Sequence, residues 1–277
     1  MTEATQSQVE RLRPWFHNLH LPDGTQTCPE HTLGDYPSFK WRAIADRIPE
    51  DLTGWSAIDI GCNAGFYSFE LARRGARVVA IEHDAHYLAQ ARWAAAQYGL
   101  VTRVEFRQSD VYELADSDEK FDLVLFLGVL YHLRYPVLGL DIVSRRVGKL
   151  LVVQSLTPPG DAIVSPPADL DLNRRERLQE PGWPKMAFIE RRLANDPTNW
   201  WAPNRACIEA LLRSTGMRIL SGPEHEIYVC EPDPNGASNM WRWNEPEFSA
   251  AVGRRRDADA AMDQRPRSSA PADGSKA

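Results

Sequence analysis

Three acidic residues follow successive apolar runs of the chain, in an order that suits the binding of an adenosine-containing ligand. Asp59 lies near the end of the first run, Glu82 ends the second, and Asp110 follows the third. A carboxylate at the position of Glu82 can accept hydrogen bonds from both ribose hydroxyls of an adenosine. Asp110 is placed to accept a hydrogen bond from the adenine amino group, with Val111 beside the ring. The alternative role of Asp110 is to cap the segment that follows it.

The turn after the first apolar run reads Asp-Ile-Gly-Cys-Asn-Ala-Gly and contains Gly61, Cys62, Asn63 and Gly65. A dinucleotide site needs the pattern G-x-G-x-x-G, because the pyrophosphate binds close to a helix N-terminus. Here that pattern is incomplete and the carboxylate of Asp59 precedes the turn. A cationic amino-acid group suits such a turn better than a phosphate does, so the turn favours S-adenosylmethionine over NAD. A strand–helix turn without any ligand is the alternative.

Alternating strands and helices must position these residues. Strands are expected over 56–60, 77–81, 103–108, 122–127 and 149–155, and two closing strands over 218–221 and 226–230. Helices are expected over 40–47, 65–74, 85–98, 186–193 and 204–215. This alternation predicts an α/β protein with a Rossmann-like, doubly wound, mainly parallel sheet of seven strands.

The pattern also predicts how the chain is divided. Residues 1–50 are expected to form an irregular N-terminal leader, and residues 51–232 the α/β domain. Within that domain, the proline-rich residues 156–203 interrupt the alternation after the fifth strand. An interruption of this length is typically functional, and we interpret it as a cover over a substrate. Residues 233–277 are expected to be an extension that is disordered from about residue 253.

The composition allows one α/β domain with additional segments. The chain has 277 residues, of which 43% are hydrophobic, and its formal net charge is −6. This charge argues against a nucleic-acid partner held mainly by electrostatic attraction. No apolar run reaches the roughly 20 residues of a membrane helix, and the first residues are polar, so a soluble, cytoplasmic protein is expected. The four cysteines are far apart and no metal-ligand spacing is present, so we predict neither disulfides nor a metal site.

Two motifs resemble a known family. The stretches DIGCNAGFYSFEL and FDLVLFLGVLYHLRYP are similar to class I S-adenosylmethionine-dependent methyltransferases. Together with KWR and IPEDLTG ahead of the first strand, they resemble the DUF1698-like family that includes the bacterial tRNA wobble-uridine carboxymethyltransferase. The resemblance covers residues 38–155.

The resemblance implies roles for individual residues. Gly61, Leu127 and Tyr131 match positions that contact the cofactor, and Lys40 matches a lysine of the family's KW motif. A lysine that helps to hold the carboxylated cofactor falls near His17, where this chain has no lysine. Transfer of a methyl group and transfer of a carboxymethyl group therefore both stay open.

Methyl transfer from a sulfonium is an in-line displacement in which the protein aligns the reactants and removes a proton from the acceptor. The loop after the fourth strand is the expected place for such groups, and it contains Tyr131 and His132. His132 is the candidate base, because the ordinary pKa of histidine suits neutral pH. The alternative is that His132 only orients the loop. Tyr131 is the second catalytic candidate, although it suits a cofactor contact better.

The end of the inserted segment carries the candidate substrate residues. Trp200 and Trp201 offer flat apolar faces, Asn199 and Asn204 offer amide hydrogen bonds, and Lys185 can meet an anionic group. Such a mixture is typical of small-molecule sites. The alternative is that the tryptophans pack the insertion onto the sheet.

Three functions agree with these features. The first, which we favour, is an enzyme: an S-adenosylmethionine-dependent methyltransferase acting on a small molecule. The second is a tRNA wobble-uridine carboxymethyltransferase that uses carboxy-S-adenosylmethionine. The third is a catalytically silent protein that binds the cofactor or a partner. No feature of the sequence indicates an oligomeric state.

Overall fold

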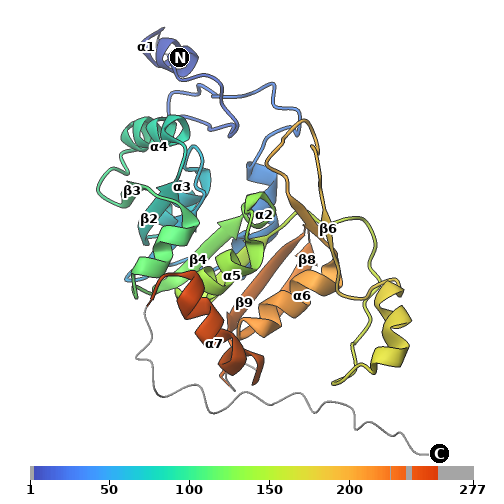
Figure 1. Ribbon diagram of the computed structural model, residues 1–277. Coiled ribbons are helices and arrows are strands. Elements are labelled where there is room, and N and C mark those ends of the chain that lie inside the picture. Colours follow the sequence, from blue (N-terminus) through green and yellow to red (C-terminus); the bar gives the residue numbers. More distant parts are fainter. Residues whose placement is uncertain (1–2, 225, 235–238, 255–277) are drawn as a thin grey trace, which may run out of the picture.

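The computed structural model describes residues 3–224, 226–234 and 239–254, and its centre is one sheet with helices on both faces (Figure 1). The strand order is β3-β2-β1-β4-β5-β9-β8. The first five strands are parallel, and β9 is antiparallel to both β5 and β8. The strands are β1 (Ser56–Ile60), β2 (Arg77–Glu82), β3 (Val104–Gln108), β4 (Phe121–Leu127), β5 (Val147–Gln154), β8 (Met217–Glu224) and β9 (Ile227–Pro232). The predicted Rossmann-like, mainly parallel sheet of seven strands is confirmed.

The central strands form because their apolar residues are covered on both faces. In β4, four consecutive residues from Leu123 to Phe126 are completely buried. Continuous apolar runs of this kind are typical of parallel strands, which carry helices on each side. One core contains side chains of α2 (Ser38–Ile44), α3 (Phe66–Arg73) and α4 (Ala85–Tyr98). The other contains side chains of η2 (Val111–Asp116), α5 (Pro136–Arg145) and α6 (Arg205–Ser214).

Helix α4 illustrates how local signals set the boundaries. The Asp84 carboxylate accepts a hydrogen bond from the backbone N–H of His86 at 2.8 Å and caps the first turn. Gly99 ends the helix with a φ of 68°, a conformation that glycine adopts without steric cost. The helix therefore covers the residues that the sequence predicts for it.

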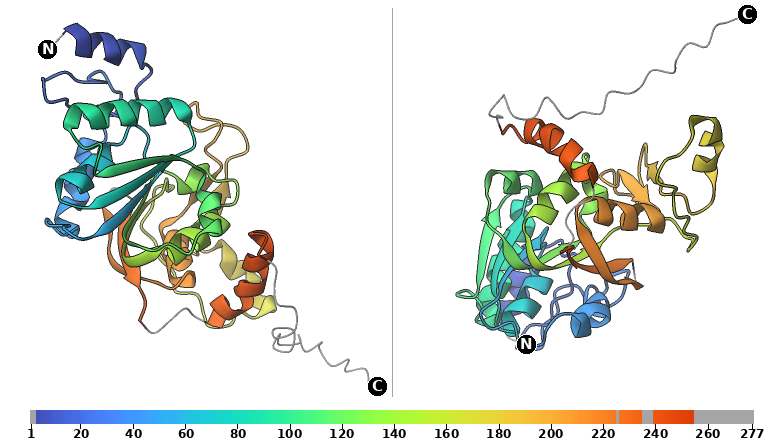
Figure 2. Two further views of the ribbon diagram at one scale, coloured as in Figure 1. Left: turned by 90° about the vertical axis from the view of Figure 1, so that its left-hand side faces the viewer. Right: turned by 90° about the horizontal axis from the view of Figure 1, so that it is seen from below.

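The inserted segment differs from its prediction. The expected helix over 186–193 is wrong, since Met186–Phe188 forms strand β6, which pairs antiparallel with β7 (Trp201–Pro203). Met186, Ile189 and Leu193 have helical spacing, but pairing with a distant strand overrides that local signal. Earlier in the segment, η4 (Leu172–Gln179) is a 3₁₀ helix without buried side chains, and it stands away from the sheet (Figures 1 and 2).

Both ends of the described chain contain helices that the sequence analysis did not predict. The N-terminal leader begins with α1 (Glu3–Arg11), and the helix expected over 40–47 is divided into α2 and η1 (Ala45–Arg47). The C-terminal extension contains α7 (Asn239–Ala251). The disorder expected from about residue 253 concerns mainly residues 255–277, which lie outside the described residues. Within the described ranges, no helix has the length and apolar character to cross a membrane.

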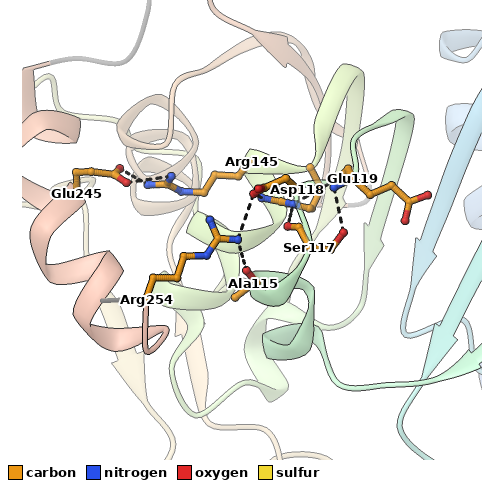
Figure 3. Close-up of polar contacts among 8 residues, drawn as sticks. Ala115, Ser117, Asp118, Glu119, Arg145, Glu245 and Arg254 are labelled. Atoms are coloured by element: carbon orange, nitrogen blue, oxygen red, sulfur yellow. Dashed lines mark hydrogen bonds and ion pairs between the residues drawn. The ribbon is translucent and has the colours of Figure 1, made fainter. Parts of the chain in front are cut away.

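Arginine side chains hold α7 against the rest of the domain (Figure 3). Arg145 of α5 pairs with Glu245 of α7. Beyond the end of α7, Arg254 donates to the carbonyl of Ala115 and pairs with Asp118 at 3.1 Å. These contacts position α7 along the outer side of α5.

Candidate active site

The loop between β1 and α3 has the backbone conformation of a ligand-binding turn. Gly61, Asn63 and Gly65 have φ values of 72°, 49° and 88°. A Cβ atom at Gly61 would lie 2.5 Å from a methyl group of Val129, so glycine is needed there for close packing as well as for conformation. Asparagine is one of the few other residues that adopt this conformation routinely. Glycine and asparagine at these positions therefore allow the tight turn that follows β1.

Asp59 is buried below this loop. Its carboxylate accepts a hydrogen bond from the hydroxyl of Ser68 at 2.6 Å. Burial raises the pKa of Asp59 to about 6, although the hydrogen bond from Ser68 opposes the rise. Ser68 thus holds the carboxylate in place beneath the turn.

Glu82 connects the loop to the end of β2. One oxygen of its carboxylate accepts from the backbone N–H of Asn63 at 2.9 Å. The other accepts from the backbone N–H of Asp84 at 3.0 Å and lies 3.1 Å from Nδ1 of His83. A carboxylate has about four acceptor positions, so a position remains for a ligand hydroxyl. Cys62 is buried beside the loop.

Asp110 has the capping role that the sequence left open. Its side chain accepts from the backbone N–H of Tyr112 at 3.0 Å, and Glu113 accepts from the backbone N–H of Asp110 at 3.1 Å. This reciprocal pair caps η2. Val111 is buried in the core, and the contact of either residue with adenine stays a prediction.

The loop after β4 places Tyr131 and His132 side by side in η3 (Leu130–His132), with ring centroids 4.3 Å apart. Leu127, at the end of β4, is half-buried below them. Burial raises the pKa of Tyr131 well above its ordinary value, so its hydroxyl stays protonated at neutral pH. Tyr131 is therefore a hydrogen-bonding group at neutral pH and unsuited to act as a base.

His132 is held by two residues of the inserted segment. Its Nδ1 atom lies 2.9 Å from the hydroxyl oxygen of Thr198, and that hydroxyl lies 2.6 Å from the Asp196 carboxylate. An ionised carboxylate only accepts, so Thr198 donates to Asp196 and accepts from Nδ1–H of His132. This assigns the proton to Nδ1 and leaves the lone pair of Nε2 free. Burial lowers the pKa of His132, while Asp196 opposes the shift, so the ring is neutral at pH 7.

The charge of Asp196, in the inserted segment, acts on Tyr87 of α4. Burial raises the pKa of Tyr87, and the carboxylates of Asp84, Glu82 and Asp196 raise it further. The charge of Asp196 thus acts on α4 as well as on the loop after β4. The role of residues 156–203 as a cover over a substrate stays a prediction.

A second polar group lies at the end of β5. The Glu226 carboxylate accepts from the side-chain amide of Gln154 at 3.2 Å and from the backbone and hydroxyl of Thr157, each at 2.9 Å. Burial lowers the pKa of Lys40, and the charge of Glu226 opposes this shift. Lys40 Nζ also lies 5.5 Å from the centroid of the Tyr36 ring. Lys40 therefore lies near Tyr36 and Glu226; the family resemblance points to Lys40, whereas the sequence gives no sign of the others.

His17 is buried in an aromatic cluster that the leader builds against α3. Its ring lies 5.7 Å from that of Tyr36, 6.4 Å from that of Phe66 and 6.2 Å from that of Tyr67. Its Nδ1 atom is buried without a hydrogen-bond partner among the described residues. Burial, with a contribution from His31, lowers the pKa of His17 from 6.5 to about 3. His17 is therefore neutral at physiological pH.

The lowered pKa of His17 predicts that this residue makes a pH-dependent contribution to the free energy of unfolding. The unfolded chain binds a proton on His17 below pH 6.5, whereas the folded chain does not until about pH 3, so folding is favoured as the pH rises between these values. Between pH 4 and pH 7, the free energy of unfolding of the wild type should increase by about 3 kcal/mol relative to that of His17→Phe. Urea denaturation of both proteins at several pH values measures this difference. A difference in the free energy of unfolding that does not change with pH would contradict the lowered pKa of His17.

The predicted substrate residues have different positions. Asn204 caps α6 by accepting from the backbone N–H of Cys207 at 2.9 Å, and it donates to the carbonyl of Trp183 at 2.8 Å. These bonds give Asn204 a structural role. Asn199 is buried and donates to the carbonyl of Leu193 at 2.9 Å, whereas the side chain of Lys185 is exposed.

Trp200 and Trp201 are attached to the loop after β4. The backbone N–H of Trp200 donates to the carbonyl of Tyr131 at 2.9 Å, and Nε1 of Trp201 lies 3.4 Å from the carbonyl of Arg134. The Arg134 guanidinium lies 4.8 Å from the centroid of the Trp200 ring. The pair therefore joins the inserted segment to the loop after β4. Among the described residues, no group of three or more His, Cys, Asp or Glu side chains could hold a metal ion.

Known proteins share this architecture. Residues 57–146 match the family model described as Methyltransferase domain. The structure of the N-terminal domain of EvdMO1 with SAH bound superimposes with a TM-score of 0.56 at 22% identity, and the match covers 83% of this chain and 95% of that one. Residues 57–146 therefore resemble an S-adenosylmethionine-dependent methyltransferase domain, and the chain shares its fold with the EvdMO1 domain.

Two curated proteins are similar to this chain in sequence. A ubiquinone biosynthesis O-methyltransferase from Azorhizobium caulinodans is 37% identical over 114 residues, which are 41% of this chain and 41% of that protein. A tRNA U34 carboxymethyltransferase from Pseudomonas paraeruginosa is 29% identical over 221 residues, which are 77% of this chain and 60% of that protein. The chain thus spans about half the length of the curated relatives that it matches. The resemblance to the family of the tRNA U34 carboxymethyltransferases is confirmed.

Proposed function

We propose that this protein transfers a methyl group from S-adenosylmethionine to a small-molecule acceptor. The observation that carries this proposal is that Glu82, at the end of β2, binds the glycine loop after β1, while Thr198 of the inserted segment binds His132 in the loop after β4. Each part has a separate task in such a reaction. The loop receives a cofactor, the histidine accepts a proton, and the cover limits the access of water.

The cofactor fits the residues that are present. Glu82 retains an acceptor position for a ribose hydroxyl, and the backbone of Gly61, Asn63 and Gly65 allows close approach. Asp59, Leu127 and the other residues predicted from the sequence would complete the contacts. When bound, S-adenosylmethionine supplies an electrophilic methyl group, and the chain supplies alignment, worth roughly 7–11 kcal/mol of the barrier in favourable cases.

His132 is proposed as the base that removes the acceptor proton. The neutral ring presents a free lone pair on Nε2, because the contact with Thr198 occupies Nδ1. The residues that fix this state, Asp196 and Thr198, belong to the cover. We therefore expect the cover to position the base as well as to enclose the substrate.

Transfer of a methyl group, rather than a carboxymethyl group, is supported by the environment of His17. The resemblance places a lysine that holds the cofactor's carboxylate near this position. His17 is neutral and has aromatic neighbours, so it offers no cation for a carboxylate. The second candidate, carboxymethylation of tRNA, is favoured by the similarity over 221 residues and by Lys40, a remaining cation.

The proposal predicts selective cofactor binding. S-adenosylmethionine and S-adenosylhomocysteine should bind with dissociation constants in the micromolar range, and NAD should not bind, because the loop lacks the dinucleotide pattern. Isothermal titration calorimetry measures each ligand. Binding of NAD in place of the other two would contradict the assignment. Native mass spectrometry of the purified protein separates the two candidate functions, since a retained carboxylated cofactor has a larger mass.

We also propose that the protein is cytoplasmic. Cys28, Cys62, Cys207 and Cys230 are all free thiols, which supports a reducing compartment.

A further inference from the structure

A cavity of about 440 Å³ lies outside the cofactor loop, between α5, the β6–β7 pair and α7. Its walls are largely apolar and include Leu138, Met186, Trp201 and Phe248. A volume of this size matches that of sites for small organic molecules. None of its lining residues belongs to the turn after β1 or to the end of β2, so the cavity is separate from the cofactor site.

Two carboxylates line this cavity, one half-buried on Asp141 and one exposed on Glu247. Asp141 of α5 and Glu247 of α7 line it, and within the described part of the chain neither makes a hydrogen bond or an ion pair. The arginine that acts electrostatically on Asp141 is Arg145. Its guanidinium is bound to Glu245 and lies 3.8 Å from the centroid of the Phe248 ring. The positive charge at this end of the cavity is therefore already engaged by α7.

The half-buried position of Asp141 has an energetic consequence. Burial raises the pKa of Asp141 to about 6, with Glu245 adding to the rise and Arg145 opposing it. An ionised carboxylate in an apolar site without a hydrogen-bond donor is unfavourable. A bound cation would remove this penalty by donating to the carboxylate.

We propose that this cavity binds a small organic cation, an amine carried on a flat or apolar body. Asp141 and Glu247 accept hydrogen bonds from the ammonium group, and charge-assisted bonds of this kind are roughly twice as strong as neutral ones. Trp201 offers its ring to the body of the ligand and attracts its positive charge, and Phe248, whose ring is already in contact with Arg145, adds apolar surface. Arg134 also lines the cavity, and its guanidinium lies over the rings of Phe188 and Trp200.

The cavity is connected to the catalytic loop. Nε1 of Trp201 lies 3.4 Å from the carbonyl of Arg134, two residues after His132. A ligand in the cavity thus contacts residues adjacent to the proposed base. The inference itself concerns binding and does not depend on the proposed reaction.

Two probes of equal shape test the charge requirement. We expect 2-phenylethylamine to bind at least tenfold more tightly than 2-phenylethanol, which replaces the ammonium by a hydroxyl. Ligand-observed NMR and calorimetry on the full chain measure both. Equal affinity for the two probes, or no binding of the amine at millimolar concentration, would overturn the inference.

Substitutions of the two carboxylates test whether the amine binds in this cavity. Asp141→Asn and Glu247→Gln should each weaken amine binding about tenfold, whereas Asp169→Asn, which changes an exposed acid of the inserted segment, should not. Amine binding that is unchanged in both cavity variants overturns the inference. S-adenosylhomocysteine affinity is measured on the same samples. If that affinity is normal while the amine fails to bind, this inference alone is wrong; if S-adenosylhomocysteine does not bind, the proposed function is wrong.

Discussion

Replacing Glu82 with Ala is expected to weaken S-adenosylhomocysteine binding by about 10- to 150-fold and to lower the melting temperature of the protein. Hydrogen bonds to a charged group are worth about 1.5–3 kcal/mol, which corresponds to that loss of affinity if the carboxylate receives the ribose hydroxyls. Stability falls as well, because the backbone N–H groups of Asn63 and Asp84 lose their acceptor. Calorimetry and thermal denaturation measure the two effects.

Glu105→Ala is a matched control, since Glu105 is an exposed acid on the neighbouring strand β3. It removes a carboxylate without affecting the loop, so cofactor affinity should not change. The result that would refute the role of Glu82 is a folded Glu82→Ala protein with wild-type affinity for S-adenosylhomocysteine.

Replacing His132 with Gln is expected to lower turnover by about 10²- to 10⁴-fold while cofactor affinity stays close to that of the wild type. Glutamine keeps polar atoms in the loop but cannot accept a proton at neutral pH. S-adenosylhomocysteine formation, measured with any acceptor that the wild type methylates, checks this result. Because the pKa of His132 is lowered, wild-type turnover should decrease only as the pH falls below the ordinary histidine value of 6.5.

Thr198→Val separates proton transfer from loop structure. Valine preserves the shape of threonine but removes the acceptor for Nδ1–H of His132. We expect a smaller loss of turnover than in His132→Gln, together with a change in the ring tautomer detected by ¹⁵N NMR. Normal turnover in His132→Gln would show that His132 only orients the loop.

The sequence predicts the parts of the fold that local signals determine. β1 and α4 have the predicted bounds, because an apolar run, a capping aspartate and a terminal glycine all lie within the segment itself. The strand β6 is different, since Met186–Phe188 lies in a segment with helical spacing but pairs with Trp201–Pro203. The leader helix α1 and the charged segment η4 bury at most one residue each, so apolar periodicity gives no sign of them.

The residues of the candidate site also fall into two groups, those that local sequence signals predict and those that distant contacts bring into place. Asp59, Gly61 and Glu82 can be found from the sequence because each follows from its place at the end of a strand. The partner of His132 cannot, since Thr198 is 66 residues away in a segment without regular periodicity. Glu226, which is bound to Gln154 and Thr157, is likewise brought to the site by the antiparallel pairing of β9 with β5. Pairing between distant segments creates these contacts, and no local pattern in the sequence predicts that pairing.

The place of β9 within the sheet has a consequence for the synthesis of this protein. β5 has its neighbour on one side only until β9 is made, and Gln154 and Glu226 are separated by 72 residues. At the usual rate of about 5–20 residues per second, the ribosome needs roughly 4–14 s for that stretch. During this time the unpaired backbone of β5 and its apolar residues Leu151, Val152 and Val153 are open to other chains. A chain terminated before Ile227 should therefore aggregate in the cell, whereas one that extends through Pro232 can complete its sheet.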